Sequence, residues 1–326
     1  MIRVALVGNT QAQAARLRRL LDVEADIILD DETRATRTAP LEVDAALSIR
    51  FTEADIAAVR CRLLQCSGVG IDGIRLDKLP VETIVCNVYE HEIPVAEYVM
   101  LALLEHEVGA GKAGAGFAGE AWGTLFRGRT PHGEVAGKTL ILVGFGRIGK
   151  AIAARARAFG LTVLAVTRSG HGSPEADEVH AAANLVTVLP RADYVVLACP
   201  LTDETRGLID AAALAAMRPS ALLVNVARGE VADEDALYAA LANNRIGGAV
   251  LDVWYTYPTL GEPNPRPARH RFESLPNVRA TPHMAGWTEG LMERRYRAMA
   301  RNLVHFARGE PLDNVVWRNG NFAEPD

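Results

Sequence analysis

Two residues with ionisable side chains stand where predicted strands end, and both are of a type that can act on a small acid. Arg228 follows the apolar run 222–226, and His283 follows the short run 278–280. A guanidinium at the end of a buried strand is costly without an anion, and its planar fork suits a carboxylate. An imidazole titrates near neutral pH and can give or take a proton. The two positions predict a site that binds a carboxylate and moves a proton.

A glycine-rich turn provides the second signal. The segment Gly-Phe-Gly-Arg-Ile-Gly, residues 144–149, directly follows the apolar run 140–143 and precedes a helical stretch over 151–158. The first glycine permits a tight turn, the second lets the backbone approach a pyrophosphate, and the third lets the helix pack close to the strand. Phosphates then lie on free amides at the helix N-terminus. The predicted cofactor contacts in this turn are Gly144, Gly146, Arg147, Ile148 and Gly149.

The loop after the next predicted strand, 162–166, bears on the choice of cofactor. NAD enzymes carry an acidic residue about 20 residues beyond the glycines, where it accepts the ribose hydroxyl. Thr167, Arg168 and Ser169 stand here instead. An acid would repel a 2′-phosphate, whereas Arg168 can pair with it. We therefore expect NADP(H), with NAD as the second choice. Further predicted cofactor contacts at strand ends are Cys199, Pro200, Thr202, Val226, Ala227, Asp252 (for the nicotinamide amide), His283 and Gly286.

The elements that must position these residues alternate along the chain. Six short apolar strands between residues 140 and 280, with helical stretches between them, indicate a doubly wound sheet whose ligand crosses the carboxyl ends of the strands. Before residue 98, short apolar runs also alternate with helical stretches, as in a smaller parallel α/β domain. The loop 66–72 of that part contains Gly68, Val69 and Gly70 after a strand end, where bare amides could meet an anion. The Gly- and Ala-rich segment 109–119 predicts a hinge or an irregular connection.

Length and composition indicate the number of domains and exclude some classes of binding partner. The 326 residues suit two domains. A net charge of -5 with no basic block argues against nucleic acid or an anionic membrane as a partner. The four cysteines lack metal-ligand spacing, which fits reduced thiols in a cytoplasm. No signal peptide and no membrane-spanning run are expected.

Several motifs in one order carry a resemblance to a known family. The glycine turn 144–149, the run Cys-Pro-Leu-Thr at 199–202, the stretch 224–230 around Arg228, and Thr-Pro-His at 281–283 resemble the D-isomer-specific 2-hydroxyacid dehydrogenases. The resemblance implies an α/β protein of two doubly wound parallel-sheet domains. A Rossmann nucleotide-binding domain, residues 99–288, would be inserted into a flavodoxin-like catalytic domain formed by residues 1–98 and 289–326. It also implies an active site between them and a homodimer.

The same resemblance implies the reaction and the roles of the residues. Hydride from a nicotinamide cofactor would reduce a 2-keto acid to a 2-hydroxy acid. Arg228 would hold the substrate carboxylate and keto oxygen, with the amides of Val69 and Gly70 completing the clamp beside Gly68. His283 would protonate the carbonyl oxygen as general acid. The family pairs this histidine with a glutamate, whose place here is taken by Tyr257.

This departure leaves alternatives open. A tyrosine can orient an imidazole but carries no charge at neutral pH. Glu262, in the same long loop, is the alternative source of this charge. Otherwise the enzyme is slower, works at lower pH, or takes a substrate that needs less acid assistance. The competing function is a nucleotide-sensing binding protein on the same scaffold, with weak or no turnover.

Overall fold

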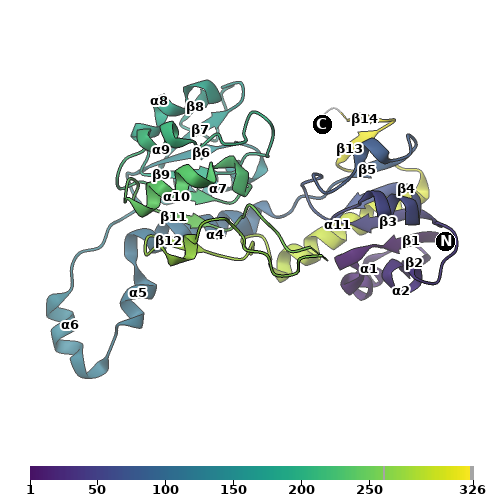
Figure 1. Ribbon diagram of the computed structural model, residues 1–326, viewed down its shortest axis with the longest axis horizontal. Coiled ribbons are helices and arrows are strands. Elements are labelled where there is room, and N and C mark those ends of the chain that lie inside the picture. Colours follow the sequence, from purple (N-terminus) through teal and green to yellow (C-terminus); the bar gives the residue numbers. More distant parts are fainter. Residues whose placement is uncertain (260, 324–326) are drawn as a thin grey trace. The chain divides into compact units, whose positions relative to one another are not determined.

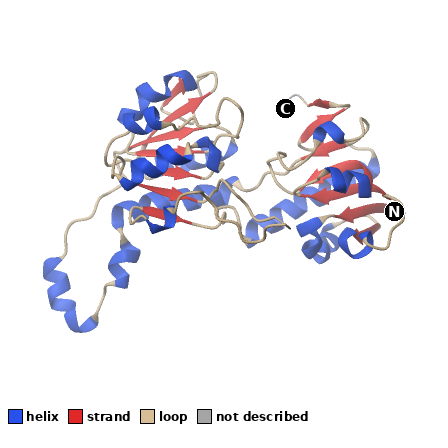
Figure 2. Cartoon of the chain, in the orientation of Figure 1, coloured by secondary structure: helices blue, strands red, loops and turns tan. Residues whose placement is uncertain are grey.

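The structure, a computed structural model, describes residues 1–259 and 261–323 and contains two compact units (Figures 1 and 2). Unit 1 comprises residues 1–90 together with the chain from residue 288 onward, and unit 2 comprises residues 91–287. The sequence placed the first boundary after residue 98, which falls inside helix α4 (Glu92–Val108). That helix packs against α7 (Arg147–Ala158), so all of it belongs to unit 2.

Seven parallel strands form the sheet of unit 2, in the order β12-β11-β10-β9-β6-β7-β8. Between β6 (Thr139–Val143) and its neighbour β9 (Tyr194–Leu197) the direction of winding reverses. This is the switch point at which doubly wound sheets bind ligands, and it confirms the predicted fold class. The remaining strands are β7 (Thr162–Thr167), β8 (Glu178–Ala181), β10 (Leu222–Asn225), β11 (Gly248–Leu251) and β12 (Val278–Ala280).

Hydrophobic cores cover both faces of this sheet. Along β6, Ile141 and Val143 enter one core while Leu140 and Leu142 enter the other, because successive strand side chains point to opposite faces. Helices α4 and α7 cover the second core. The first core is covered by α8 (Leu185–Val188), α9 (Ala211–Ala216) and α10 (Glu234–Ala242).

The sheet of unit 1 has the order β14-β13-β5-β4-β3-β1-β2. Its first five strands follow the flavodoxin-like order 2-1-3-4-5, and β13 pairs antiparallel with β5. Helix α11 (Glu289–Arg308) packs against α1 (Ala14–Leu20), so the chain returns to the first unit as expected from the sequence. The strands are β1 (Ile2–Leu6), β2 (Ala25–Leu29), β3 (Leu41–Ser48), β4 (Val59–Cys66), β5 (Ile84–Cys86), β13 (Val315–Arg318) and β14 (Asn321–Phe322).

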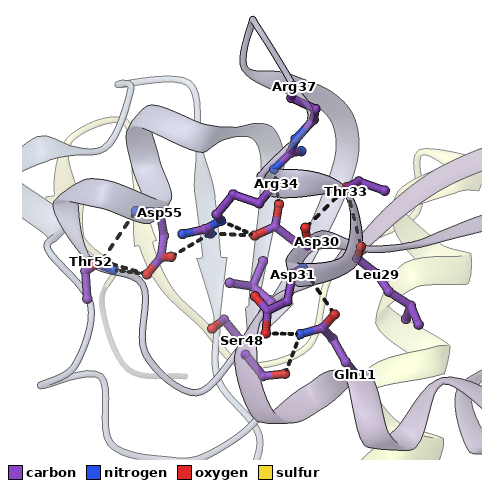
Figure 3. Close-up of polar contacts among 12 residues, drawn as sticks. Gln11, Leu29, Asp30, Asp31, Thr33, Arg34, Arg37, Ser48, Thr52 and Asp55 are labelled. Carbon is purple, nitrogen blue, oxygen red and sulfur yellow. Dashed lines mark hydrogen bonds and ion pairs between the residues drawn. The ribbon is translucent and has the colours of Figure 1, made fainter. Parts of the chain in front are cut away.

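A buried ion-pair network joins two helices of unit 1 (Figure 3). Asp30, the first residue of α2 (Asp30–Arg34), is fully buried and pairs with Arg34 at 2.5 Å and with Arg37. Arg34 also reaches Asp55 of α3 (Glu53–Ala58) at 2.7 Å. One buried carboxylate therefore pairs with two guanidinium groups, and Arg34, through Asp55, ties α2 to α3.

An exposed arm, residues 109–134, connects α4 to β6. Helices α5 (Ala110–Ala115) and α6 (Trp122–Gly128) lie in it, so the expectation of an irregular connection over 109–119 is wrong for α5. Gly109 adopts a left-handed conformation (φ 62°) and ends α4, after which alanines favour a new helix. No described helix is long and apolar enough to span a membrane.

Candidate active site

The glycine turn of unit 2 has the geometry that a dinucleotide needs. Gly144 has φ +96°, and a Cβ there would lie 2.5 Å from the backbone nitrogen of Cys199. A Cβ on Gly149 would lie 2.5 Å from the carbonyl oxygen of Gly144, whereas one on Gly146 would meet open space. Gly146 caps α7, whose first amides have no partner within the helix. The turn therefore fits a pyrophosphate at the start of α7.

The residues expected at the ribose lie at the carboxyl end of β7. Arg168 and Ser169 are exposed, and the hydroxyl of Thr167 accepts the amide of Gly170 at 3.0 Å. A hydrogen bond from Thr202, and to a smaller extent the charge of Arg168, lower the pKa of Glu204. The loops after β7 and β9 therefore lie near each other at the switch point.

Arg228 is positioned by the turn that follows β10. Asn225 at the end of this strand accepts the amide of Ala227 at 3.1 Å and donates to the carbonyl of Arg228 at 2.9 Å. The Arg228 guanidinium donates to the carbonyl of Ala227 at 2.8 Å. A Cβ on Gly229 would lie 2.5 Å from the carbonyl carbon of Trp254, so this glycine allows the loops after β10 and β11 to touch.

His283 is held in a left-handed conformation (φ 56°) by a buried carboxylate. Asp252, at the end of β11, accepts the Thr281 hydroxyl at 2.6 Å and the amides of Met284 and Ala285 at 2.8 and 2.9 Å. The sequence predicted Asp252 as a ligand of the nicotinamide amide. In the structure, both of its oxygens hold the turn that presents His283.

A further hydrogen bond links the turn that contains His283 to α4. Because the hydroxyl of Thr281 donates to Asp252, it accepts from the hydroxyl of Tyr98, 2.6 Å away. Tyr98 was not predicted from the sequence, since a tyrosine in an apolar helix is ordinarily a core residue. The indole of Trp254 also donates to the carbonyl of Thr281 at 2.9 Å.

Tyr257 contacts His283, the candidate general acid, directly. Its Oη is 2.8 Å from Nδ1 of His283, and it accepts the amide of Trp254 at 3.2 Å. Glu262 instead closes a turn with Thr259 through backbone groups and the threonine hydroxyl. Among the described residues, no hydrogen bond or ion pair joins the Glu262 carboxylate to His283. The imidazole is therefore oriented by a neutral phenol.

The charges around the imidazole oppose each other. Burial lowers the pKa of His283; Asp252 raises it and Arg228 lowers it further. Burial also raises the pKa of Tyr257, with opposing contributions from the Trp254 amide and Arg228. Arg228 thus lies close enough to act on both side chains, which places all three groups at one edge of the sheet.

One predicted part of the site lies in the other unit. Gly68, Val69 and Gly70 follow β4 of unit 1, where the amide of Val88 donates to the carbonyl of Gly68 at 3.1 Å. All the other predicted site residues belong to unit 2. The pairing of the Val69 and Gly70 amides with a carboxylate held by Arg228 stays a prediction.

Comparison with known proteins identifies the family. Residues 99–285 match the D-isomer specific 2-hydroxyacid dehydrogenase, NAD binding domain. A glyoxylate reductase of Thermococcus onnurineus is 34% identical over 93% of this chain and 91% of its own length. The chain belongs to this family.

Other relatives align with different fractions of this chain and of their own length. A glyoxylate reductase of Thermococcus kodakarensis is 43% identical, over 56% of this chain and 53% of its own length, so that match spans about half of the relative. An NADPH-dependent glyoxylate/hydroxypyruvate reductase of Sinorhizobium meliloti, solved with NADP and malonate, is 25% identical. It superposes with a TM-score of 0.75 over 100% of this chain and 99% of its own.

Proposed function

We propose that this protein reduces a 2-keto acid to a D-2-hydroxy acid with NADPH. The observation that carries the proposal is the meeting of Arg228, His283 and Tyr257 at the sheet edge that also contains the glycine turn. An arginine that can fork a carboxylate, beside an imidazole that can exchange a proton, is the minimum needed for carbonyl reduction in a 2-keto acid.

Each side chain has a defined task in this reaction. Arg228 binds the substrate carboxylate and orients the carbonyl group. When bound, the cofactor supplies the hydride. His283 gives the proton that the carbonyl oxygen needs, and Asp252 keeps the imidazole on its turn. Gly144, Gly146 and the amides that begin α7 would hold the pyrophosphate.

The preference for NADPH rests on the loop after β7. Arg168 and Ser169 are exposed at the end of this strand, so both can meet a 2′-phosphate. In this place an acidic residue would favour NAD. The Sinorhizobium reductase solved with NADP and malonate is NADPH-dependent.

We include a homodimer and a cytoplasmic location in the proposal. In the arm, four large apolar side chains are exposed in α6 and in the link that precedes it: Phe117, Trp122, Leu125 and Phe126. A second copy of the chain is the partner that would cover them. All four cysteines carry free thiols, and burial raises the pKa of Cys66 to about 11, in keeping with unreactive thiols in a reducing compartment.

The experiment that tests this function is NADPH oxidation with glyoxylate, hydroxypyruvate and larger 2-keto acids, repeated with NADH. We expect turnover with a higher kcat/KM for NADPH. His283→Gln should lower kcat by roughly 100-fold or more, the usual worth of a positioned acid, while NADPH binding persists. Tight NADPH binding without turnover of any keto acid would favour the nucleotide-sensing alternative, and a clear preference for NADH would contradict the cofactor assignment.

A further inference from the structure

The hydroxyl of Tyr257 takes part in two hydrogen bonds that favour one position for its single hydrogen. It accepts the Trp254 amide at 3.2 Å, and Nδ1 of His283 is 2.8 Å away. In the described part of the chain, Nδ1 is the one acceptor within hydrogen-bond distance of this hydroxyl. The tautomer in which Oη donates to Nδ1 satisfies both groups within the described protein, because Oη already accepts the Trp254 amide. In this tautomer neutral His283 carries its own proton on Nε2, the nitrogen that does not contact Tyr257.

We propose that Tyr257 is the source of the proton in keto-acid reduction and that neutral His283 relays it. This inference rests on the proposed function. Hydride adds to C2 of the keto acid and the carbonyl π pair moves to oxygen. That oxygen forms a bond to the Nε2 proton as the N–H bond breaks. At the same time the Oη proton of Tyr257 moves to Nδ1. The imidazole ends neutral, and the phenolate takes a proton from water.

The relay makes the reaction feasible without an imidazolium. A neutral imidazole acting alone would be left as an anion after losing the Nε2 proton. When Tyr257 supplies the second proton, the negative charge rests on a phenolate, and phenols ionise with a pKa of only about 10. An alkoxide is a far stronger base than a phenolate, so the overall transfer from Tyr257 to the product oxygen runs downhill.

The groups around the pair agree with a relay through neutral His283. Burial and Arg228 lower the pKa of His283, against the opposing charge of Asp252, so little imidazolium is present at neutral pH. For Tyr257, burial, Asp252 and Glu230 raise the pKa, whereas the Trp254 amide and Arg228 lower it. The amide and the guanidinium are the two groups that stabilise a transient phenolate. Tyr257 is 36% exposed, so water can return the proton.

The test compares wild type with Tyr257→Phe in single-turnover reduction of glyoxylate by NADPH between pH 5 and 9. Wild type should keep its rate through neutral pH. Tyr257→Phe depends on the imidazolium, so above the His283 pKa its rate should fall about tenfold per pH unit, at least about 30-fold below wild type at pH 8. At pH 5 the two rates should agree within a few-fold.

Tyr255→Phe is the matched control, because this neighbouring hydroxyl donates to the carbonyl of Ala232 at 3.0 Å and does not touch His283. It should keep the wild-type profile. In mixtures of H2O and D2O, the wild-type rate should depend on isotope fraction as a curve that requires two moving protons. The Tyr257→Phe rate should follow a straight line.

A further readout needs no turnover. Nitrogen-15 NMR of the histidines at pH 7 should show His283 neutral, with Nδ1 unprotonated in wild type. A protonated Nδ1, or a Tyr257→Phe variant with the wild-type pH profile, would overturn the relay while leaving the reductase function intact. An equal loss of rate at every pH in Tyr257→Phe would assign Tyr257 a structural role and also overturn it. No oxidation of NADPH by wild type would instead remove the proposed function.

Discussion

His283 occupies a backbone conformation that residues other than glycine rarely adopt. Its φ of 56° is maintained because Asp252 accepts the two amides that follow it in the same turn. A buried carboxylate that binds several donors is costly to remove, since each donor would lose its partner. The direction of the imidazole is thus determined by a residue on another strand, β11, and is in place before any ligand binds.

A substitution at Arg228 can separate the effect of its positive charge from that of its planar guanidinium group. Arg228→Lys keeps the positive charge but loses the planar fork that binds a carboxylate through two hydrogen bonds. We expect a large drop in kcat/KM for the keto acid with little change in the Kd for NADPH. Steady-state kinetics with glyoxylate and NADPH titrations of the apoprotein measure the two effects. Near-normal turnover would remove Arg228 from the substrate site.

The pH profile should respond to a carboxylate placed beside the imidazole. In Tyr257→Glu, a negative charge next to Nδ1 favours the imidazolium and raises the pKa of His283, which wild type holds below its ordinary value. The protonated form then survives to higher pH. Keto-acid reduction by Tyr257→Glu should therefore decline at a higher pH than reduction by Tyr257→Phe. Glu262→Gln should leave the profile unchanged, and a downward shift would identify Glu262 as the partner of His283.

The sequence predicted which residues could carry out the chemistry, but it did not predict the contacts that hold those residues in place. Arg228 and His283 stand close after the ends of predicted strands, so their types and positions were sufficient to single them out. The roles of Asp252 and Tyr98 as supports for the His283 turn depend on contacts between β11, α4 and the loop after β12. These segments are distant in sequence, and no local pattern encodes their contacts.

At the scale of elements, the ion-pair network of α2 should stabilise unit 1. Asp30→Ala would leave Arg34 and Arg37 without their buried partner, and breaking a buried pair in this way costs about 3 kcal/mol or more. Urea unfolding should show this loss in the free energy of unfolding. Glu32→Ala, an exposed change in the same helix, is the control and should have little effect. A stability equal to wild type would show that the arginines find other partners.

The elements that the sequence predicted are those with a clear apolar period. The strands β6, β7, β9 and β10 are buried on both faces and carry continuous apolar runs. β8 reads Glu-Val-His-Ala at the sheet edge and has no such run, so it was missed. The strands β2, β13 and β14 were also missed, although β2 and β13 contain apolar residues in a row. Edge strands need few apolar residues, because only part of their surface is buried.

At the scale of the whole molecule, the arm (residues 109–134) is the segment whose apolar side chains a single copy of the chain leaves exposed. The ring of Trp122 packs at a tilt against those of Phe117 and Phe126, with ring centroids 6.0 and 5.3 Å apart, yet all three rings remain exposed. Solvent-exposed apolar clusters of this kind mark interaction surfaces. The proposed homodimer would bury them.

Trp122→Glu should therefore weaken the dimer, since it places a charge in the centre of this cluster. Light scattering after size-exclusion chromatography should report a shift toward the monomer mass at micromolar concentration. Phe159→Glu is a control at another exposed aromatic of unit 2 and should leave the mass unchanged. A wild-type protein that is already monomeric would contradict the dimer and leave the arm without its proposed role.

The insertion of unit 2 into unit 1 also sets an order for folding during synthesis. The core of unit 1 joins Ile2 and Val4 with Tyr296, Met299 and Leu303 of α11. Roughly 200 residues separate these two parts, which a ribosome translates in roughly 10 to 40 s. Unit 2 is continuous and can fold as soon as it emerges. The first 90 residues must meanwhile wait with apolar strand faces uncovered, so the nascent chain is most exposed to aggregation and to chaperones over this interval.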